Sequence, residues 1–241
     1  MKSTFTGRRL LMTLAIILAA VAFVFGQNPE MQQKVTEVKQ AAAANKQALA
    51  QYTWVETVTI SLKGEQKKQE HFQVRLGPDG KPQKQSLDQP EAQSSAASGG
   101  RGGRVKEHVV EKKKEEYKDY ADSIKALIEQ YVPPDKDLIE QARQKGNVAL
   151  SPAPGGDGQF QLALTNYVKQ GDKMTIVFDG AQKGIVSLSI NSYLDDPKDA
   201  VTASVQFSAI PSGPNHVSAV TINGVSKQLT IAIANSNYQH L

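Results

Sequence analysis

Residues 52–76 constrain the fold most, because pattern, turn and residue type there predict the same structure. Large apolar side chains recur at nearly every second position, with threonine or serine between them: Tyr52, Trp54, Val58, Ile60 and Leu62. This period of two is typical of a strand with one buried face. A glycine-containing turn at 63–66 leads into a second alternating run, with Phe72, Val74 and Leu76 on one face. The stretch therefore predicts an antiparallel β-hairpin.

Glu56 interrupts the apolar face of the first strand, between Trp54 and Val58. A buried carboxylate is costly unless it is paired. Either Glu56 lies near the strand end and reaches water, or it lines a cavity opposite a basic residue, as in a ligand-binding concavity. Core packing is the alternative to a cavity wall for Trp54. The candidate wall comprises the residues of this face on both strands: Trp54, Glu56, Val58, Ile60, Phe72 and Val74.

The first 26 residues predict export. Three basic residues accompany a 16-residue run, 10–25, that is apolar except for Thr13, and the small residue Gly26 precedes a candidate cleavage site at Gln27. This is the pattern of a secretory signal peptide. The alternative is an uncleaved membrane anchor, but the apolar run is shorter than the roughly 20 residues that span a bilayer. We expect a signal peptide over 1–26 and a periplasmic or secreted protein.

Charge and cysteine content exclude several classes of function. The chain has 28 Lys+Arg and 24 Asp+Glu, and cleavage would leave 25 basic against 24 acidic residues. The basic pI therefore owes much to the targeting segment and predicts no nucleic-acid partner. The chain contains no cysteine, which excludes lipobox acylation, disulfides and thiol catalysis.

Residues 27–88 predict a helix followed by three strands. Asn28-Pro29 is a helix start, and apolar residues then follow at three- and four-residue spacing: Met31, Val35, Val38, Ala42, Leu49 and Tyr52. After the hairpin, a weaker third strand is expected over 82–87. Residues 89–104 consist of Gln, Ser, Ala, Gly, Arg and similar residues with no large apolar side chain. They predict a flexible linker.

Residues 105–146 predict a helical insertion. A long helix over 105–132 has a first half rich in Lys and Glu and a second half with an apolar and aromatic face: Tyr117, Tyr120, Ile124, Leu127, Ile128 and Tyr131. Pro133-Pro134 ends this helix. Asp135 is the expected N-cap of a short second helix, which Gly146 closes.

Residues 147–241 are β in character throughout. Short runs of alternating apolar residues are separated by turns, and Asn223-Gly224 predicts a type I′ hairpin between strands over 217–222 and 225–233. We expect this region to pack with 27–88 as one domain. The fold class is therefore α+β: a curved antiparallel sheet of roughly ten strands, an incomplete β-barrel, with an N-terminal helix and a helical insertion.

No catalytic constellation stands out in the sequence. The four histidines, His71, His108, His216 and His240, are scattered without a partner at metal-ligand spacing. Neither a glycine-rich phosphate loop nor a nucleophile elbow is present. Asp195, Asp196 and Asp199 lack the spacing of a calcium loop. The sequence thus predicts no catalytic residue, no metal site and no cofactor.

The order of these elements resembles the periplasmic lipoprotein-carrier and anti-sigma-regulator superfamily, also called LolA-like. Tyr52-x-Trp54, which opens the first strand after the helix, is part of the resemblance. The resemblance spans most of residues 28–235. It implies a half-barrel that wraps helices and shelters acyl chains. The charged insertion at 89–118 departs from the pattern, and no functional residue transfers by motif. Short stretches, among them 235–238, are also similar to uncharacterised exported bacterial proteins.

We therefore expect an exported, non-enzymatic binding or carrier protein for an apolar ligand, such as a lipid, an acyl chain or a lipoprotein. The alternative is an envelope module that uses the charged helix to contact a protein or polymer, and peripheral membrane contact fits either interpretation. A hydrolase is the third hypothesis, disfavoured because no nucleophile–base pair is evident. The sequence specifies no oligomeric state.

Overall fold

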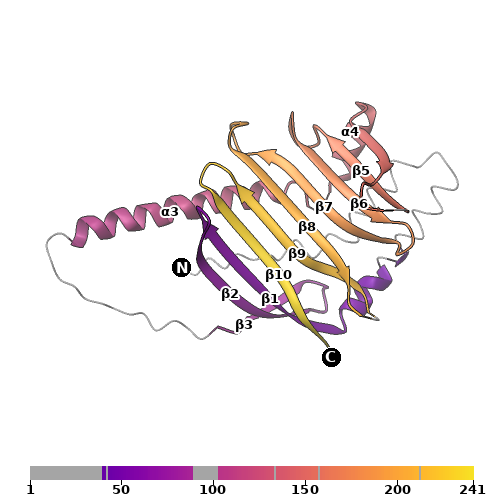
Figure 1. The fold of residues 1–241 in the computed structure, drawn as a ribbon, viewed down its shortest axis with the longest axis horizontal. Helices are drawn as coiled ribbons and strands as arrows, with labels where there is room; N and C mark the ends of the chain where they lie inside the picture. Colours follow the sequence, from indigo (N-terminus) through magenta and orange to yellow (C-terminus); the bar gives the residue numbers. More distant parts are fainter. Residues whose placement is uncertain (1–39, 42, 89–102, 133, 157, 212) are drawn as a thin grey trace.

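The computed structural model of this 241-residue chain describes residues 40–41, 43–88, 103–132, 134–156, 158–211 and 213–241. Two helices, α3 (Gly103–Ile128) and α4 (Lys136–Gln144), accompany the sheet in Figure 1, and residues 43–49 are helical directly before β1. The strands are β1 (Tyr52–Leu62), β2 (Glu65–Leu76), β3 (Pro82–Ser86), β4 (Val148–Pro152), β5 (Gln159–Thr165), β6 (Lys173–Asp179), β7 (Gly184–Tyr193), β8 (Ala200–Ala209), β9 (Asn215–Gly224) and β10 (Leu229–His240).

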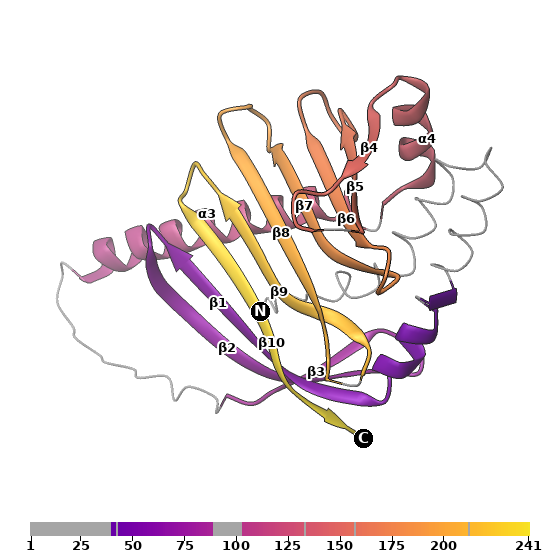
Figure 2. The same ribbon diagram turned by 45° about the vertical axis from the view of Figure 1, so that its right-hand side comes forward.

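These strands form one open antiparallel sheet in the order β3-β2-β1-β10-β9-β8-β7-β6-β5-β4. The first strand pairs with the last, from Tyr52 opposite His240 to Leu62 opposite Leu229. The sheet is strongly twisted (Figure 2), and β3 and β4 are its two edges. The predicted fold class is confirmed: the described part is an α+β fold whose sheet does not close into a barrel.

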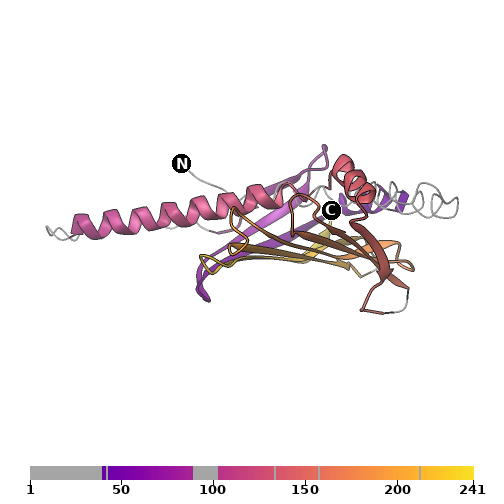
Figure 3. The same ribbon diagram turned by 90° about the horizontal axis from the view of Figure 1, so that it is seen from above.

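The helices α3 and α4 lie on one face of the sheet (Figure 3), and the first half of α3 projects beyond the sheet. The second half of α3 carries the expected buried face, including Tyr120, Ile124 and Leu127, and Tyr131 is buried in the turn that follows the helix. The helix α3 crosses the end of the sheet at which β9 ends. At this crossing the Tyr120 hydroxyl donates to Asp199 at 2.7 Å. Burying side chains of this size contributes roughly 1.5–3 kcal/mol each, which fixes the helix to the sheet.

The expected cap of α4 is confirmed. The Asp135 carboxylate accepts from the backbone N–H groups of Asp137 at 2.8 Å and Leu138 at 3.1 Å. These two donors have no partner inside the helix, so the side chain satisfies them. At the other end Gly146 follows the C-cap with φ +71°, a conformation that glycine adopts without strain.

The predicted hairpin between the last two strands is present, as β9 and β10, but its turn is not at Asn223-Gly224. Both residues belong to β9, where Asn223 pairs with Thr230 and Gly224 with Leu229, and the turn is formed by 225–228. The reason is tertiary. A Cβ on Gly224 would lie 2.5 Å from Ile124 Cδ1, so this glycine lets α3 approach the sheet rather than forming the turn.

The bounds of α3 differ from the predicted ones, and some predicted elements lie outside the described residues. The helix α3 begins at Gly103, inside the expected linker, and regular helix ends at Ile128 rather than at residue 132. The expected signal peptide over 1–26, the helix start at Asn28 and the linker residues 89–102 lie outside the described residues. Within the described ranges, no helix has the length and apolar content needed to cross a membrane.

Candidate functional site

The six residues of the predicted wall lie together on one face of β1 and β2. Trp54 is opposite Val74, and Glu56 is opposite Phe72, so each pair shares a side of the sheet. Trp54, Glu56, Val58 and Val74 are buried, and Ile60 and Phe72 are half-buried. Val58, Ile60 and Phe72 belong to the core that also contains the α3 side chains. The wall therefore faces the helix side of the sheet.

Glu56 is buried and paired with a base, so it does not reach water at the end of its strand. The ammonium group of Lys84, on β3, forms an ion pair with the Glu56 carboxylate, and these side chains are only 12% and 4% exposed. The ammonium also lies 5.8 Å from the centre of the Phe72 ring, in cation–π range. Sequence reasoning missed Lys84, because its strand is short and mostly polar.

Tyr238 lies between two further rings at the start of β1. Its ring stacks on Trp54 with centroids 5.6 Å apart and an interplanar angle of 20°. On its other flank, the His216 ring centroid is 4.0 Å away. Burial raises the pKa of the Tyr238 hydroxyl, with a further contribution from the Glu56 charge. Burial lowers the pKa of the His216 imidazole.

The two strands that carry Tyr238 and His216 part at this point. The ladder between β10 and β9 runs from Leu229 opposite Gly224 to Ala234 opposite Ala219. Beyond Ala234, side-chain hydrogen bonds connect the two strands instead of backbone pairs. Asn235 Nδ2 donates to the carbonyl oxygen of Val217 at 2.8 Å. The Tyr238 hydroxyl donates to the same oxygen at 3.4 Å.

Three buried polar atoms flank Tyr238 without a hydrogen-bond partner among the described residues: Trp54 Nε1, His216 Nδ1 and Asn235 Oδ1. Trp54 is 0% exposed and His216 is 7% exposed. An unsatisfied buried donor or acceptor costs about 1–3 kcal/mol, so such groups are rare and mark sites of interest. We name Trp54, Glu56, Lys84, His216, Asn235 and Tyr238 the Tyr238 cluster.

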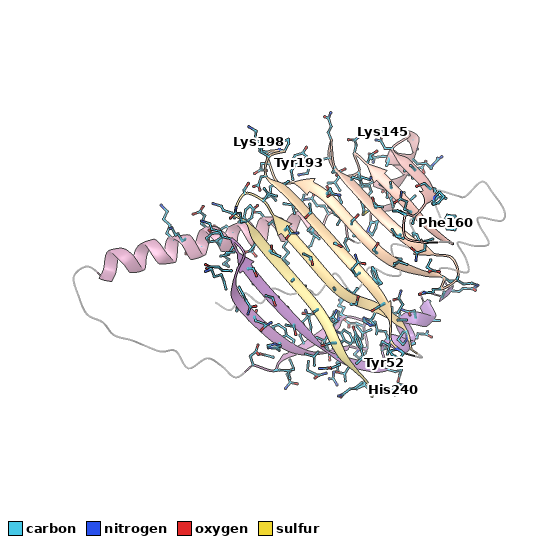
Figure 4. The ribbon with its side chains drawn as sticks, in the orientation of Figure 1. Tyr52, Lys145, Phe160, Tyr193, Lys198 and His240 are labelled. Atoms are coloured by element: carbon cyan, nitrogen blue, oxygen red, sulfur yellow. The ribbon has the colours of Figure 1, made fainter. Side chains whose placement is uncertain are left out.

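A row of aromatic side chains crosses the helix-facing side of the sheet at the same end. Phe160 of β5 pairs with Phe178 of β6, and Phe207 of β8 pairs with Val217 of β9, next to Tyr238. Figure 4 shows Phe160, Tyr52 and His240 away from Tyr193 and Lys198, which lie at the end where α3 crosses. We name these residues the aromatic row: Phe160, Phe178, Phe207, Tyr238, Trp54 and Phe72.

The aromatic row is only partly covered. Phe160 is 46% exposed, and its neighbour Leu150, on the same side of β4, is 41% exposed. Phe178, Phe207, Tyr238 and Phe72 are half-buried. A groove of about 450 Å³ opens beside the row, lined by Ala41, Ala44, Asn45, Ala48, Gln51, Tyr52, Gly213, Pro214 and His240. Apolar surface is thus available at this end of the molecule.

A second buried polar group, around Asp172, has its hydrogen bonds satisfied. The Tyr131 hydroxyl donates to Asp172 at 2.6 Å and lies 2.8 Å from Ser192 Oγ. The same carboxylate accepts from the backbone N–H groups of 167–169. This arrangement holds the loop before β6 against the turn that follows α3. In the described ranges no three His, Asp or Glu side chains gather as metal ligands.

Comparison with solved structures finds two similar chains. One is a LolA superfamily protein from Nitrosomonas europaea, with 10% sequence identity, a TM-score of 0.35 and coverage of 86% of this chain and 93% of that one. The other is a DUF1329 family protein from Desulfovibrio piger, with 11% identity, a TM-score of 0.36 and coverage of 85% and 92%. No protein-family model matches the sequence, and a search of curated proteins gives no match. Both likenesses are structural only.

Proposed function

We propose that this chain is an exported, non-enzymatic carrier that shelters an apolar ligand, such as a lipid, an acyl chain or a lipoprotein, along the aromatic row. The observation that carries the proposal is the partial covering of this row at the end of the sheet away from α3. A folded protein rarely leaves rings such as Phe160, 46% exposed, on the side of a sheet that faces its core. An acyl chain lying there would bury these rings.

The geometry suits a long, narrow ligand. The row crosses β5, β6, β8, β10, β1 and β2, and neighbouring strands lie about 4.8 Å apart. A chain of methylene groups could contact several rings in turn, and each buried methylene contributes about 0.8 kcal/mol. The groove beside Tyr52 and His240 offers an entrance at the end of the row.

Titration of lipid-stripped protein with lysophospholipid below its micelle concentration tests the proposal. Trp54 is the single tryptophan of the chain and lies in the row, so its emission should change saturably with ligand. Phe160→Ser should weaken binding about tenfold, because a lost ring removes apolar contact area. Val177→Ser, on the opposite face of β6, is the matched control and should leave affinity unchanged. A flat titration would reject the carrier function.

The second candidate function is an interaction module of the cell envelope. The observation that favours it is the first half of α3, which projects beyond the sheet (Figures 1 and 3). Its described side chains include exposed Lys112, Lys113 and Glu115. Deletion of the projecting residues should leave lipid titration intact if the chain is a carrier. It should abolish capture of an envelope partner if the helix is the functional surface.

A further inference from the structure

The three unpartnered atoms around Tyr238 offer a defined hydrogen-bonding pattern. Trp54 Nε1–H can only donate, and Asn235 Oδ1 can only accept. The orientation of the Asn235 amide is fixed, because its Nδ2 donates to Val217 at 2.8 Å. His216 Nδ1 donates or accepts according to its tautomer. A group that satisfies Trp54 and Asn235 together must itself accept one hydrogen bond and donate another.

The charge of the site favours a neutral group. Glu56 and Lys84 are nearly buried and already neutralise each other. A carboxylate head would compete with Glu56 for Lys84, and an ammonium head would compete with Lys84 for Glu56. In either case one charge would be left buried without its partner, which is strongly unfavourable. A neutral head leaves the ion pair intact.

Tyr238 packs against the rings of Trp54 and His216, which carry two of these atoms. Its side chain is held by stacking on Trp54 and by one long hydrogen bond of 3.4 Å. Its strand has left the ladder with β9 after Ala234 and pairs only with β1. The preceding residue, Asn237, has φ +53°, at the register shift between β1 and β10. A rotation of the Tyr238 side chain would therefore open the space between Trp54 and His216 without breaking the pairing with β1.

We propose that the Tyr238 cluster recognises the polar head of the ligand and that this head is a neutral amide, which lies at the edge of the Trp54 indole once the Tyr238 ring has turned aside. The amide oxygen accepts from Trp54 Nε1–H, and the amide N–H donates to Asn235 Oδ1. This inference rests on the proposed carrier function and narrows its ligand class from apolar chains in general to acyl amides. The acyl chain then extends along the aromatic row.

Matched ligands test the inference: octanamide, octanoate and octylamine, titrated by calorimetry into the lipid-stripped protein. Octanamide should bind about tenfold more tightly than either charged ligand, the effect of one buried hydrogen bond. Trp54→Phe keeps an aromatic ring and removes the N–H, so it should weaken octanamide alone and reduce its advantage over the charged ligands, which the Glu56–Lys84 pair still disfavours. Phe160→Ser is the control and should weaken all three ligands by the same factor.

A second measurement needs no variant. The single tryptophan gives one indole N–H signal in a nitrogen–proton NMR spectrum, and octanamide should move this signal while octanoate should not. Equal affinity for the three ligands, with an unmoved signal, would show that ordered water alone satisfies these atoms and would overturn the inference, leaving the carrier function in place. Failure of all three ligands, and of lysophospholipid, to bind would overturn both.

Discussion

At the scale of single residues, the ion pair between Glu56 and Lys84 explains why a carboxylate occupies an apolar face. The pair draws one partner from β1 and the other from the edge strand β3, so it also ties that edge to the sheet. A buried pair is not in itself evidence of high stability, because desolvation offsets the attraction. Removing only one of the two charges, however, leaves the other charge buried without a partner, which is strongly destabilising.

We expect Glu56→Gln to lower the free energy of unfolding by about 3–5 kcal/mol, because it leaves the Lys84 ammonium buried without a counter-charge. Lys84→Met should have a similar effect through Glu56. The double variant Glu56→Gln with Lys84→Met should recover most of the loss, since it removes both charges. Urea unfolding of the four proteins measures this coupling. Additive losses in the double variant would contradict the buried-pair interpretation.

His216 predicts a pH dependence of stability. Burial holds its folded-state pKa below the ordinary value of 6.5, so between these two values the unfolded state binds a proton that the folded state does not. The free energy of unfolding is therefore at its full value above pH 6.5 and falls as pH decreases through the lower folded-state pKa. Urea unfolding from about pH 7.5 to about pH 5 measures this slope.

The control for this prediction is a second histidine variant. His216→Gln should flatten the slope, and His240→Gln, at the exposed end of β10, should retain it. An unchanged slope in His216→Gln would assign the pH dependence to other groups.

At the scale of elements, the contact between α3 and β9 depends on a missing side chain. The Cβ of an alanine at Gly224 would lie 2.5 Å from Ile124 Cδ1 and 2.7 Å from Tyr120 Cε1. Both distances are below any normal contact, so the Ile124 and Tyr120 side chains, or the helix that carries them, would have to move. Tyr131, in the turn directly after the helix, donates to Asp172, and this contact would shift if the helix moved.

We expect Gly224→Ala to lower the melting temperature, at a cost of roughly 1–3 kcal/mol for overpacking. Adding Ile124→Val removes the methyl group that clashes and should restore part of this loss. Val225→Ala, at an exposed position one residue on, is the control and should have little effect. If Gly224→Ala proved neutral, the close approach of α3 would not be needed for stability.

At the scale of the whole molecule, the pairing of β1 with β10 joins the two ends of the described chain. The pair runs from residue 52 opposite 240 to residue 62 opposite 229. Contacts so distant in sequence form slowly and hold only when the whole sheet is present. The hairpin of β1 and β2 therefore depends on the C-terminal strand for its place in the fold.

Deletion of residues 229–241 should abolish cooperative unfolding, because it exposes the edges of β1 and β9 and removes Tyr238 from Trp54. Trp54 emission should shift toward that of a solvated indole. Deletion of 239–241 alone is the control and should retain a single transition. A cooperative transition in the larger deletion would show that the two parts of the sheet fold independently.

The sequence by itself determined the features that depend on local periodicity. Alternation specifies β1 and β2. The spacing of Tyr120, Ile124 and Leu127 specifies the buried face of α3, and Asp135 specifies the start of α4. These features can be predicted from the sequence because each depends only on residues within or next to the element that it defines.

Only the tertiary structure decided which strands meet. It placed Lys84 opposite Glu56, and it placed Tyr238 and His216 beside Trp54. It also showed Gly224 to serve packing rather than a turn. The physical reason is that strand order depends on how one apolar face is buried across the whole sheet. Residues more than 150 positions apart in the sequence, such as Trp54 and Tyr238, then share one site.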